Sequence, residues 1–149
     1  MTTPKVINSF AGDYSFLSNF HPVDIYYEGI VYPSLEHAYQ ASKTSDIAIR
    51  LRIANMSTPG GAKRFGHTIQ LRTGWWDQRE AIMYRLIQIK FSKKDLRLKL
   101  LQTEEAELIE GNTWGDTVWG FDLRTGKGEN KLGKLLMKTR AMLRHELNL

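Results

Sequence analysis

The chain has 149 residues, of which 42% are hydrophobic and 25% charged. This composition excludes a disordered or fibrous chain and predicts one soluble globular domain over residues 1–149. Cysteine is absent and no apolar run approaches the ~20 residues of a membrane span, so thiolate catalysis, a disulfide framework and a membrane partner are excluded. We expect a cytoplasmic protein. The net charge of +5 indicates an anionic partner without choosing between a nucleotide and a nucleic acid.

The first predicted element is a hairpin over residues 23–32. Apolar and polar residues alternate in its first half, Glu28-Gly29 can form the turn, and β-favouring residues return. Pro33-Ser34 is expected to end the second strand. Ser34 is then the predicted N-cap of a helix that runs to about Lys43.

Further helices follow along the chain. One is expected after Ser45-Asp46, up to Met56, with Pro59-Gly60-Gly61 breaking it. Asp77-Gln78-Arg79-Glu80 resembles a capping box, with Asp77 in the cap position, ahead of apolar residues at helical spacing. The last two helices are predicted over residues 95–101 and 132–147, and the stretch Gly111–Gly128 has little helical pattern. The fold class is therefore α+β: a mostly helical single domain with a small β-sheet near the N-terminus.

The positive charge is concentrated near the C-terminus. Residues 124–144 hold seven Lys or Arg against the single acid Glu129, a sum of +6, so the rest of the chain sums to −1. Such a segment is either a solvated basic helix face or a field that attracts an anionic substrate.

Several common motifs are absent. Residues 128–134 match the first seven positions of a phosphate-binding loop, but Leu135 follows where that loop needs Ser or Thr for magnesium. The glycines still allow the backbone to come close to a phosphate ahead of the last helix, where the dipole at the helix N-terminus favours an anion. The four histidines show no metal-binding spacing, and no serine-hydrolase elbow is present. We therefore expect no zinc site.

The helix after Ser34 carries one chemically notable face. Glu36, Gln40 and Lys43 are spaced at i, i+4 and i+7, which places a carboxylate, an amide and an amine together. By spacing alone, this pattern is typical of an ordinary solvent-exposed face with an ion pair. In a partly desolvated cleft, however, a lysine beside an acid can lose its proton near neutral pH. A neutral amine can attack the anomeric carbon of a sugar and form a Schiff base, with the carboxylate moving the proton.

Blocks of residues through most of the chain resemble the YbiA-like (NADAR) family. The resemblance opens with Phe16-Leu17-Ser18-Asn19-Phe20 and the segment Tyr32-Pro33-Ser34-Leu35-Glu36-His37-Ala38-Tyr39-Gln40-Ala41-Ser42-Lys43. It continues, in family order and over roughly residues 14–140, with these positions: Pro59, Ala62, Gly66, Trp76, Met83, Lys90-Phe91, Leu108-Ile109-Glu110, Asp116-Thr117-Val118-Trp119-Gly120, Gly128-Glu129-Asn130-Lys131-Leu132-Gly133, Leu135-Leu136-Met137 and Arg140.

The resemblance implies a compact, mostly helical fold and hydrolysis of N-glycosidic bonds in phosphorylated ribose compounds. It also implies that no metal and no organic cofactor is needed. Members of the family act on early riboflavin-pathway intermediates or remove ADP-ribose from modified guanine bases. By position, Lys43 resembles the family lysine proposed to trap the anomeric carbon, and Glu36 its helix-borne acid. The predicted catalytic residues are Lys43, Glu36 and Asp116, and the predicted substrate-binding residues are Asn19, Gln40, Trp76, Trp119 and Asn130. We expect the ribose to lie between Trp119 and the Glu36–Lys43 face.

Local structure offers a second explanation for several of these residues. At most one of Trp75 and Trp76 is expected inside the core, and Phe20 is expected in the core rather than the site. Asn19 can cap a turn, Asn130 can be the N-cap of the last helix, and Asp116 can cap its own loop. Where many relatives read Trp-Gly-x-Gly, this chain reads Trp119-Gly120-Phe121-Asp122, so we expect the loop to Gly126 to shape the substrate pocket.

Three functions remain open. The first is hydrolysis of a free riboflavin-pathway aminopyrimidine riboside phosphate or similar nucleotide. The second is removal of ADP-ribose from guanine in nucleic acid, which the basic C-terminal segment favours. The third is a non-catalytic nucleotide-binding module, against which the presence of both Glu36 and Lys43 argues.

Overall fold

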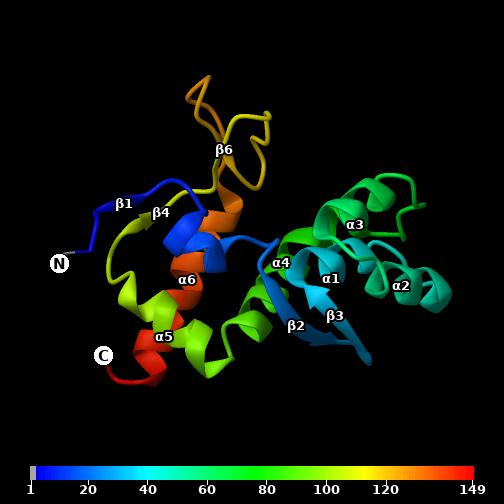
Figure 1. Ribbon diagram of the computed structural model, residues 1–149, viewed down its shortest axis with the longest axis horizontal. Coiled ribbons are helices and arrows are strands. Elements are labelled where there is room, and N and C mark those ends of the chain that lie inside the picture. The colour runs from blue at the N-terminus through cyan, green and yellow to red at the C-terminus, as the bar shows by residue number, and fades with distance from the viewer. Residues whose placement is uncertain (1–2) are drawn as a thin grey trace. The chain divides into compact units, whose positions relative to one another are not determined.

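The computed structural model describes residues 3–149, and the chain folds into two compact units. The first unit comprises the residues up to Ser18 together with Phe91–Leu149, and the second comprises Asn19–Lys90. The part of the chain described contains six α-helices, one 3-10 helix and three two-stranded sheets (Figure 1). The α+β, mostly helical class is therefore confirmed, although the strands form three separate pairs.

The second unit begins with the predicted hairpin. Strands β2 (Pro22–Tyr27) and β3 (Ile30–Ser34) lie antiparallel and side by side (Figure 1). Glu28 and Gly29 join them with φ angles of 48° and 86°, the left-handed pair that a tight two-residue turn requires. β3 runs two residues beyond the predicted end of the hairpin at Tyr32, and it ends at Ser34, within the Pro33-Ser34 pair expected to stop it. The N–H that Pro33 lacks is tolerated because this hairpin strand has a partner on one side only.

Helix α1 (Leu35–Ala41) follows β3 without a loop. The Ser34 hydroxyl accepts a hydrogen bond from the His37 amide at 3.1 Å, which confirms the predicted N-cap. All seven helical residues are buried. The helix ends two residues before the predicted end at Lys43, whose amide instead donates to the Gln40 carbonyl in a closing turn at 3.2 Å.

Helix α2 (Ile47–Ala54) confirms the helix predicted after Ser45-Asp46. The Asp46 carboxylate caps it by accepting from the amide of Ala48 at 2.9 Å. The guanidinium of the buried Arg50 donates to the Glu28 carboxylate at 3.0 Å. This ion pair connects α2 to the hairpin turn.

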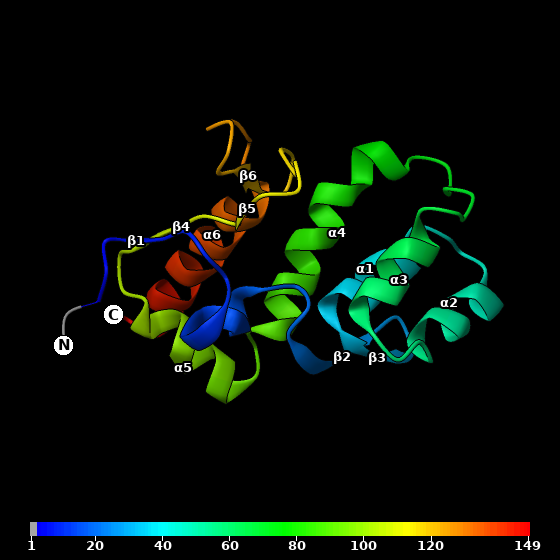
Figure 2. The ribbon, with the colours of Figure 1, turned by 45° about the horizontal axis from the view of Figure 1, so that its top comes forward.

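Helix α3 (Pro59–Gly66) was not predicted, because Pro59-Gly60-Gly61 was interpreted only as a helix breaker. Proline is well tolerated in a first helical turn, where its missing N–H has no partner to lose. The Thr58 hydroxyl caps the turn by accepting from the Gly61 amide at 3.0 Å. α1 contacts α3, and the two helices lie side by side (Figures 1 and 2).

Helix α4 (Trp75–Lys90) closes the second unit and packs against α1 and β2. It begins two residues before Asp77, so the predicted cap position of Asp77 is wrong and this carboxylate lies in the first turn. Trp75 is 2% exposed, with its ring centroid 5.3 Å from that of Tyr39, whereas Trp76 is 67% exposed. The expectation that at most one of the two tryptophans is inside is confirmed.

The first unit is assembled from short strands and two long helices. β1 (Val6–Ile7) pairs in parallel with β4 (Glu107–Leu108), and β5 (Gly111–Asn112) pairs in parallel with β6 (Phe121–Asp122). A 3-10 helix, η1 (Gly12–Leu17), precedes the helices α5 (Lys94–Gln102) and α6 (Lys131–Glu146). α5 and α6 match the last two predicted helices and contact each other through a leucine-rich core. No helix between residues 3 and 149 has the length and apolar character that a membrane span requires.

Candidate functional site

The carboxylate of Glu36 lies in the interior of the second unit. Glu36 is 6% exposed and Gln40 is 3% exposed, so the interpretation of this helix face as solvent-exposed is wrong. The Gln40 amide nitrogen donates to Glu36 Oε1 at 3.0 Å. Burying a carboxylate is costly unless hydrogen bonds compensate it. The Glu36–Gln40 hydrogen bond therefore compensates part of the cost of burying this carboxylate in a helix whose residues are all enclosed.

Lys43 lies half-buried just beyond the end of α1. Its ammonium points to the Gly66 carbonyl at 3.5 Å, a long hydrogen bond. Burial lowers the pKa of Lys43 below its ordinary value of 10.5, and neighbouring Lys63 lowers it further, while the Glu36 carboxylate raises it. Burial is the largest of these effects, so the fraction of neutral amine exceeds that of an exposed lysine. A neutral amine is the form that attacks an anomeric carbon.

The segment before α4 is tied to Lys43 through the backbone. The Arg72 amide donates to the Lys43 carbonyl at 2.8 Å, and the Arg72 guanidinium donates to the Gln78 side chain at 2.7 Å. Trp76 follows shortly after, with the Arg79 guanidinium 5.0 Å from its ring centroid. The exposed indole of Trp76 presents a flat aromatic surface of the kind on which a nucleobase stacks.

Asn19 and Phe20 lie at the entrance to the hairpin. The Asn19 carbonyl accepts from the Glu36 amide at 3.1 Å, and its side-chain amide points to the sulfur of Met83 at 3.6 Å. Asn19 thus contacts the first turn of α1 and also α4. Phe20 is 42% exposed, so its predicted place in the core is wrong. It sits in the short, turn-forming connection to β2, where its side chain is not enclosed.

Asp116 holds its own loop, in the first unit. One carboxylate oxygen, Oδ1, accepts from three successive amides, those of Val118, Trp119 and Gly120, at 3.0–3.3 Å. The Asn112 side chain bonds both the amide and the carbonyl of Asp116. The capping alternative for Asp116 is therefore confirmed, and it fixes the backbone of the half-buried Trp119.

Asn130 fastens the start of α6 to the β4–β5 connection. It has a left-handed φ of 51°, and its side chain accepts from the Glu110 amide and donates to the Leu108 carbonyl, both at 2.9 Å. Asn130 is the N-cap residue of α6, which confirms that alternative, although its side chain makes no capping hydrogen bond. Both polar atoms of this amide are engaged with the backbone.

The N-terminus of α6 is also occupied. The amides of Lys131 and Leu132 donate to the carbonyls of Val118 and Trp119 at 3.1 and 3.0 Å. An anion bound at a helix N-terminus needs amides that point to it. The expectation that a phosphate can bind at residues 128–134 is therefore wrong for these two amides, because carbonyl groups of the preceding loop already accept their hydrogen bonds.

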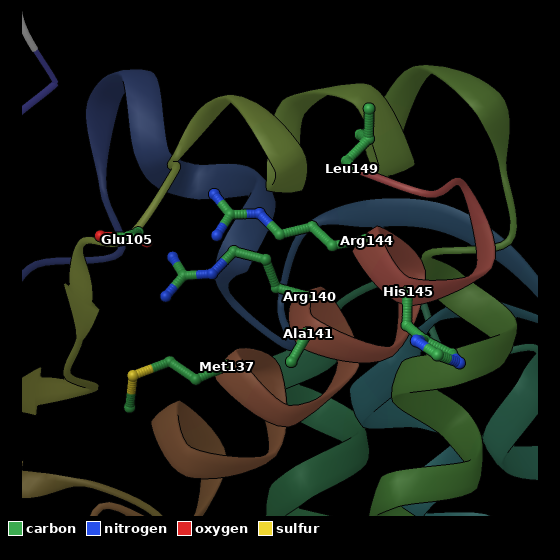
Figure 3. A pocket seen from close by; sticks show the side chains of 7 residues that line it. All are labelled: Glu105, Met137, Arg140, Ala141, Arg144, His145 and Leu149. Carbon is green, nitrogen blue, oxygen red and sulfur yellow. The ribbon is translucent and has the colours of Figure 1, made fainter.

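The C-terminal basic segment contains one buried cation. Arg140 is 7% exposed and donates to the Thr103 hydroxyl and the Ala106 carbonyl, both at 2.8 Å. It borders a pocket at the C-terminal end of α6, where the guanidinium groups of Arg140 and Arg144 extend in the same direction, toward Glu105 (Figure 3). None of the predicted site residues lines this pocket. Arg140 therefore stabilises the turn after α5 through these hydrogen bonds. The surface charge of the basic segment comes from its other, more exposed cations.

The structure divides the predicted site residues between the two units. Asn19, Glu36, Gln40, Lys43 and Trp76 belong to the second unit, and Asp116, Trp119 and Asn130 belong to the first. Within the second unit, hydrogen bonds and electrostatic contacts join Asn19, Glu36, Gln40 and Lys43.

Sequence reasoning assigned no role to Lys63 or Gly66, which both lie on α3 beside Lys43. Proline at the first position of α3 was the available signal for that helix. Between residues 3 and 149, no three His, Asp or Glu side chains gather as metal ligands would.

Known proteins resemble this chain over most of its length. Residues 8–144 match the NADAR domain family. The chain is 38% identical over 138 residues to N-glycosidase YbiA of Shigella flexneri serotype 5b, covering 91% of this chain and 85% of that protein. It is 35% identical over 138 residues to a riboflavin biosynthesis protein of Vibrio vulnificus, covering 91% of this chain and 36% of that protein. The NMR structure of Escherichia coli YbiA is similar with a TM-score of 0.84 at 34% identity, covering 98% of this chain and 89% of that one.

Proposed function

This chain belongs to the NADAR family, and from that membership we propose that it hydrolyses the N-glycosidic bond of a phosphorylated ribose compound with Lys43 as nucleophile. Its relatives are named as N-glycosidases, and the chain is a hydrolase of that class. One observation carries the assignment of residues. A half-buried lysine with a lowered pKa lies within electrostatic reach of a buried, hydrogen-bonded carboxylate.

The proposed first step breaks the bond between C1′ and the base nitrogen. The neutral Lys43 amine bonds to C1′, and the electron pair of the C1′–N bond leaves with the base, which takes up a proton. The amine nitrogen, now positively charged, loses a proton to Glu36. Glu36 then gives that proton to the ring oxygen as the sugar ring opens, which leaves a protonated Schiff base between Lys43 and C1′ and an ionised Glu36.

Water completes the proposed reaction. It adds to C1′ of the Schiff base, releases the sugar and restores the free amine, while Glu36 orients the water and returns a proton. The alternative is direct attack of water on C1′, guided by Glu36 or Asp116. The lowered pKa of Lys43 favours the covalent route, because direct attack has no use for a neutral amine.

The proposed substrate is an aminopyrimidine riboside phosphate of the riboflavin pathway or a similar nucleotide. The riboflavin biosynthesis protein of Vibrio vulnificus, similar to this chain over 138 residues, supports this choice. Lys63 and Arg64 on α3 supply positive charge on the same unit as Lys43, which suits the phosphate. The exposed Trp76 suits the base.

A second candidate is removal of ADP-ribose from guanine in nucleic acid. The observation in its favour is the row of exposed cations in the first unit, which includes Arg124, Lys127, Lys134 and Lys138. Such side chains can contact successive phosphates of a nucleic acid. A non-catalytic binding module is less well supported, since binding alone gives no reason to bury the Glu36 carboxylate beside a lysine.

The test is release of free base from the aminopyrimidine riboside phosphate and from ADP-ribosylated guanosine. Wild type is compared with Lys43→Ala and with Lys5→Ala, which removes an exposed lysine elsewhere in the chain. We expect turnover of one substrate, lost in Lys43→Ala and kept in Lys5→Ala. Wild-type protein that is folded and releases base from neither substrate would contradict both substrate assignments and favour the binding module.

A further inference from the structure

Gly66 is the last residue of α3, and its backbone does not need to be glycine. Glycine near a helix C-terminus usually provides a left-handed φ, but Gly66 is not among the residues with positive φ between residues 3 and 149. The residue is buried. Another feature of this position must therefore favour the smallest side chain.

That feature is the Gln40 side chain. A Cβ atom added at residue 66 would overlap Gln40 Oε1 and lie 2.7 Å from Gln40 Cδ and 3.2 Å from its Cβ. Glycine at this position leaves the space that the glutamine occupies between α1 and α3. An alanine here would have to displace Gln40, because the atoms it meets include the Cδ of an enclosed amide.

The Gln40 amide is poorly explained as a stabilising group. Its Oε1 atom is buried and has no hydrogen-bond partner among residues 3–149, which is ordinarily unfavourable. Its nitrogen donates to Glu36 Oε1 at 3.0 Å. If the amide were turned by 180°, Gln40 Oε1 would face Glu36 Oε1, and the two oxygens would repel each other. The hydrogen bond to Glu36 therefore fixes the orientation of the amide and leaves Gln40 Oε1 without a partner in the part of the chain described.

We propose that Gly66 and Gln40 are positioning residues for the Glu36–Lys43 pair. Gly66 admits Gln40, Gln40 fixes the Glu36 carboxylate, and the Gly66 carbonyl accepts from the Lys43 ammonium at 3.5 Å. A single residue of α3 thus sets the positions of both reacting groups. This inference rests on the proposed function. It also assigns Gln40 to holding Glu36 rather than to contacting the substrate, because its free oxygen is enclosed.

The test uses four variants: Gly66→Ala, Gln40→Ala, the double variant, and Gly60→Ala. Gly60→Ala is the matched control, because it makes the same change in the same helix where a Cβ would meet only Arg64 at 3.5 Å, an ordinary contact. Base release is measured as kcat and KM over a range of pH, and folding is measured by the melting temperature.

We expect Gly66→Ala and Gln40→Ala each to lower kcat by about 10-fold to 100-fold, as small displacements of reacting groups do, with KM changed by less than about threefold. The acidic limb of the rate profile should move to lower pH, since a released Glu36 supports the Lys43 ammonium less. The double variant should come close to the melting temperature of Gln40→Ala, because the overlaps with Oε1 and Cδ are gone and only the 3.2 Å contact with the Cβ of residue 40 remains. It should not recover the wild-type kcat. Gly60→Ala should behave like wild type.

The inference and the proposed function fail in different ways. Wild-type kcat and pH profile in Gln40→Ala, with turnover lost in Lys43→Ala, would overturn the positioning role alone. Undiminished turnover in Lys43→Ala would overturn the proposed function instead. If Gly66→Ala does not fold, the kcat and pH profile of Gln40→Ala still test the positioning role, because removing side-chain atoms from residue 40 creates no steric overlap.

Discussion

Three effects act on the proton of the Lys43 ammonium: burial and two charged neighbours. Burial and the charge of Lys63 favour its loss, and the carboxylate of Glu36 opposes it. The result is an amine that is neutral more often than an exposed lysine, with an acceptor for its proton close by. This balance, rather than the mere presence of a lysine, is what suits the position to nucleophilic attack.

Lys63→Met tests that balance. Removing the Lys63 charge removes an effect that lowers the pKa of Lys43, so that pKa should rise. Because the neutral amine reacts, the acidic limb of kcat/KM against pH should move to higher pH. Lys94→Met, an exposed lysine in the first turn of α5, is the matched control. A limb that does not move, or that moves to lower pH, would show that Lys43 is not the titrating group.

Asp116 is expected to act through its loop. Asp116→Asn keeps a side-chain oxygen that can accept from the amides of residues 118–120, whereas Asp116→Ala removes it. We predict that the asparagine variant keeps kcat within about threefold of wild type and that the alanine variant does not. Loss of turnover in both variants, with unchanged melting temperature, would instead make the Asp116 carboxylate a participant in the reaction.

At the scale of elements, the sequence predicted the helices and turns that depend on residues close together in the chain. The Glu28-Gly29 turn, the Ser34 cap and the apolar spacing of α4, α5 and α6 depend on neighbouring residues, and these predictions are confirmed. α3 was missed because two glycines follow its proline, and the packing of α3 against α1 outweighs their low helix propensity.

The same distinction applies to the candidate site. The spacing of Glu36, Gln40 and Lys43 placed a carboxylate, an amide and an amine near one another, but spacing alone favoured an exposed face. Burial of α1 depends on the hairpin and on three other helices that contact it, which no local pattern reports. The roles of Gly66 and Lys63 likewise depend on α3, so they were visible only once that helix was known.

Helix α3 should depend on its N-terminal cap. Thr58→Ala removes the hydroxyl that accepts from the Gly61 amide, which should lower the free energy of unfolding by about 1 kcal/mol. Thr125→Ala, an exposed threonine of the turn before α6, is the control and should change it by less than about 0.5 kcal/mol. Chemical denaturation measures both. Equal stability of the two variants would mean that the Thr58 hydroxyl does not secure the helix that carries Gly66.

At the scale of the whole molecule, charge and chemistry are distributed unequally. The charges of residues 124–144 sum to +6, whereas the whole chain has a net charge of +5. This segment lies in the first unit, and Glu36 and Lys43 lie in the second. The family match runs through both units, from residue 8 to residue 144. On the proposed mechanism, the charge of residues 124–144 can therefore be changed by substitution without touching Glu36 or Lys43.

Charge reversal separates the two candidate substrates. Lys134→Glu with Lys138→Glu replaces two exposed cations of α6. We predict that kcat/KM for the aminopyrimidine riboside phosphate changes by less than about threefold. If nucleic acid is the substrate instead, KM for ADP-ribosylated DNA should rise more than about tenfold in the variant and also with added salt. A steep loss on the small substrate would contradict the proposal that Lys63 and Arg64, rather than the cations of α6, suit its phosphate.

The most direct measurement of the central claim is the mass of the protein after turnover in the presence of borohydride. Borohydride reduces a Schiff base to a stable amine, so wild type should gain the mass of one sugar phosphate, located at Lys43 by peptide mapping. Lys43→Ala should gain none. Continued release of base by wild type without any adduct would contradict nucleophilic attack by Lys43 and leave direct attack by water as the mechanism.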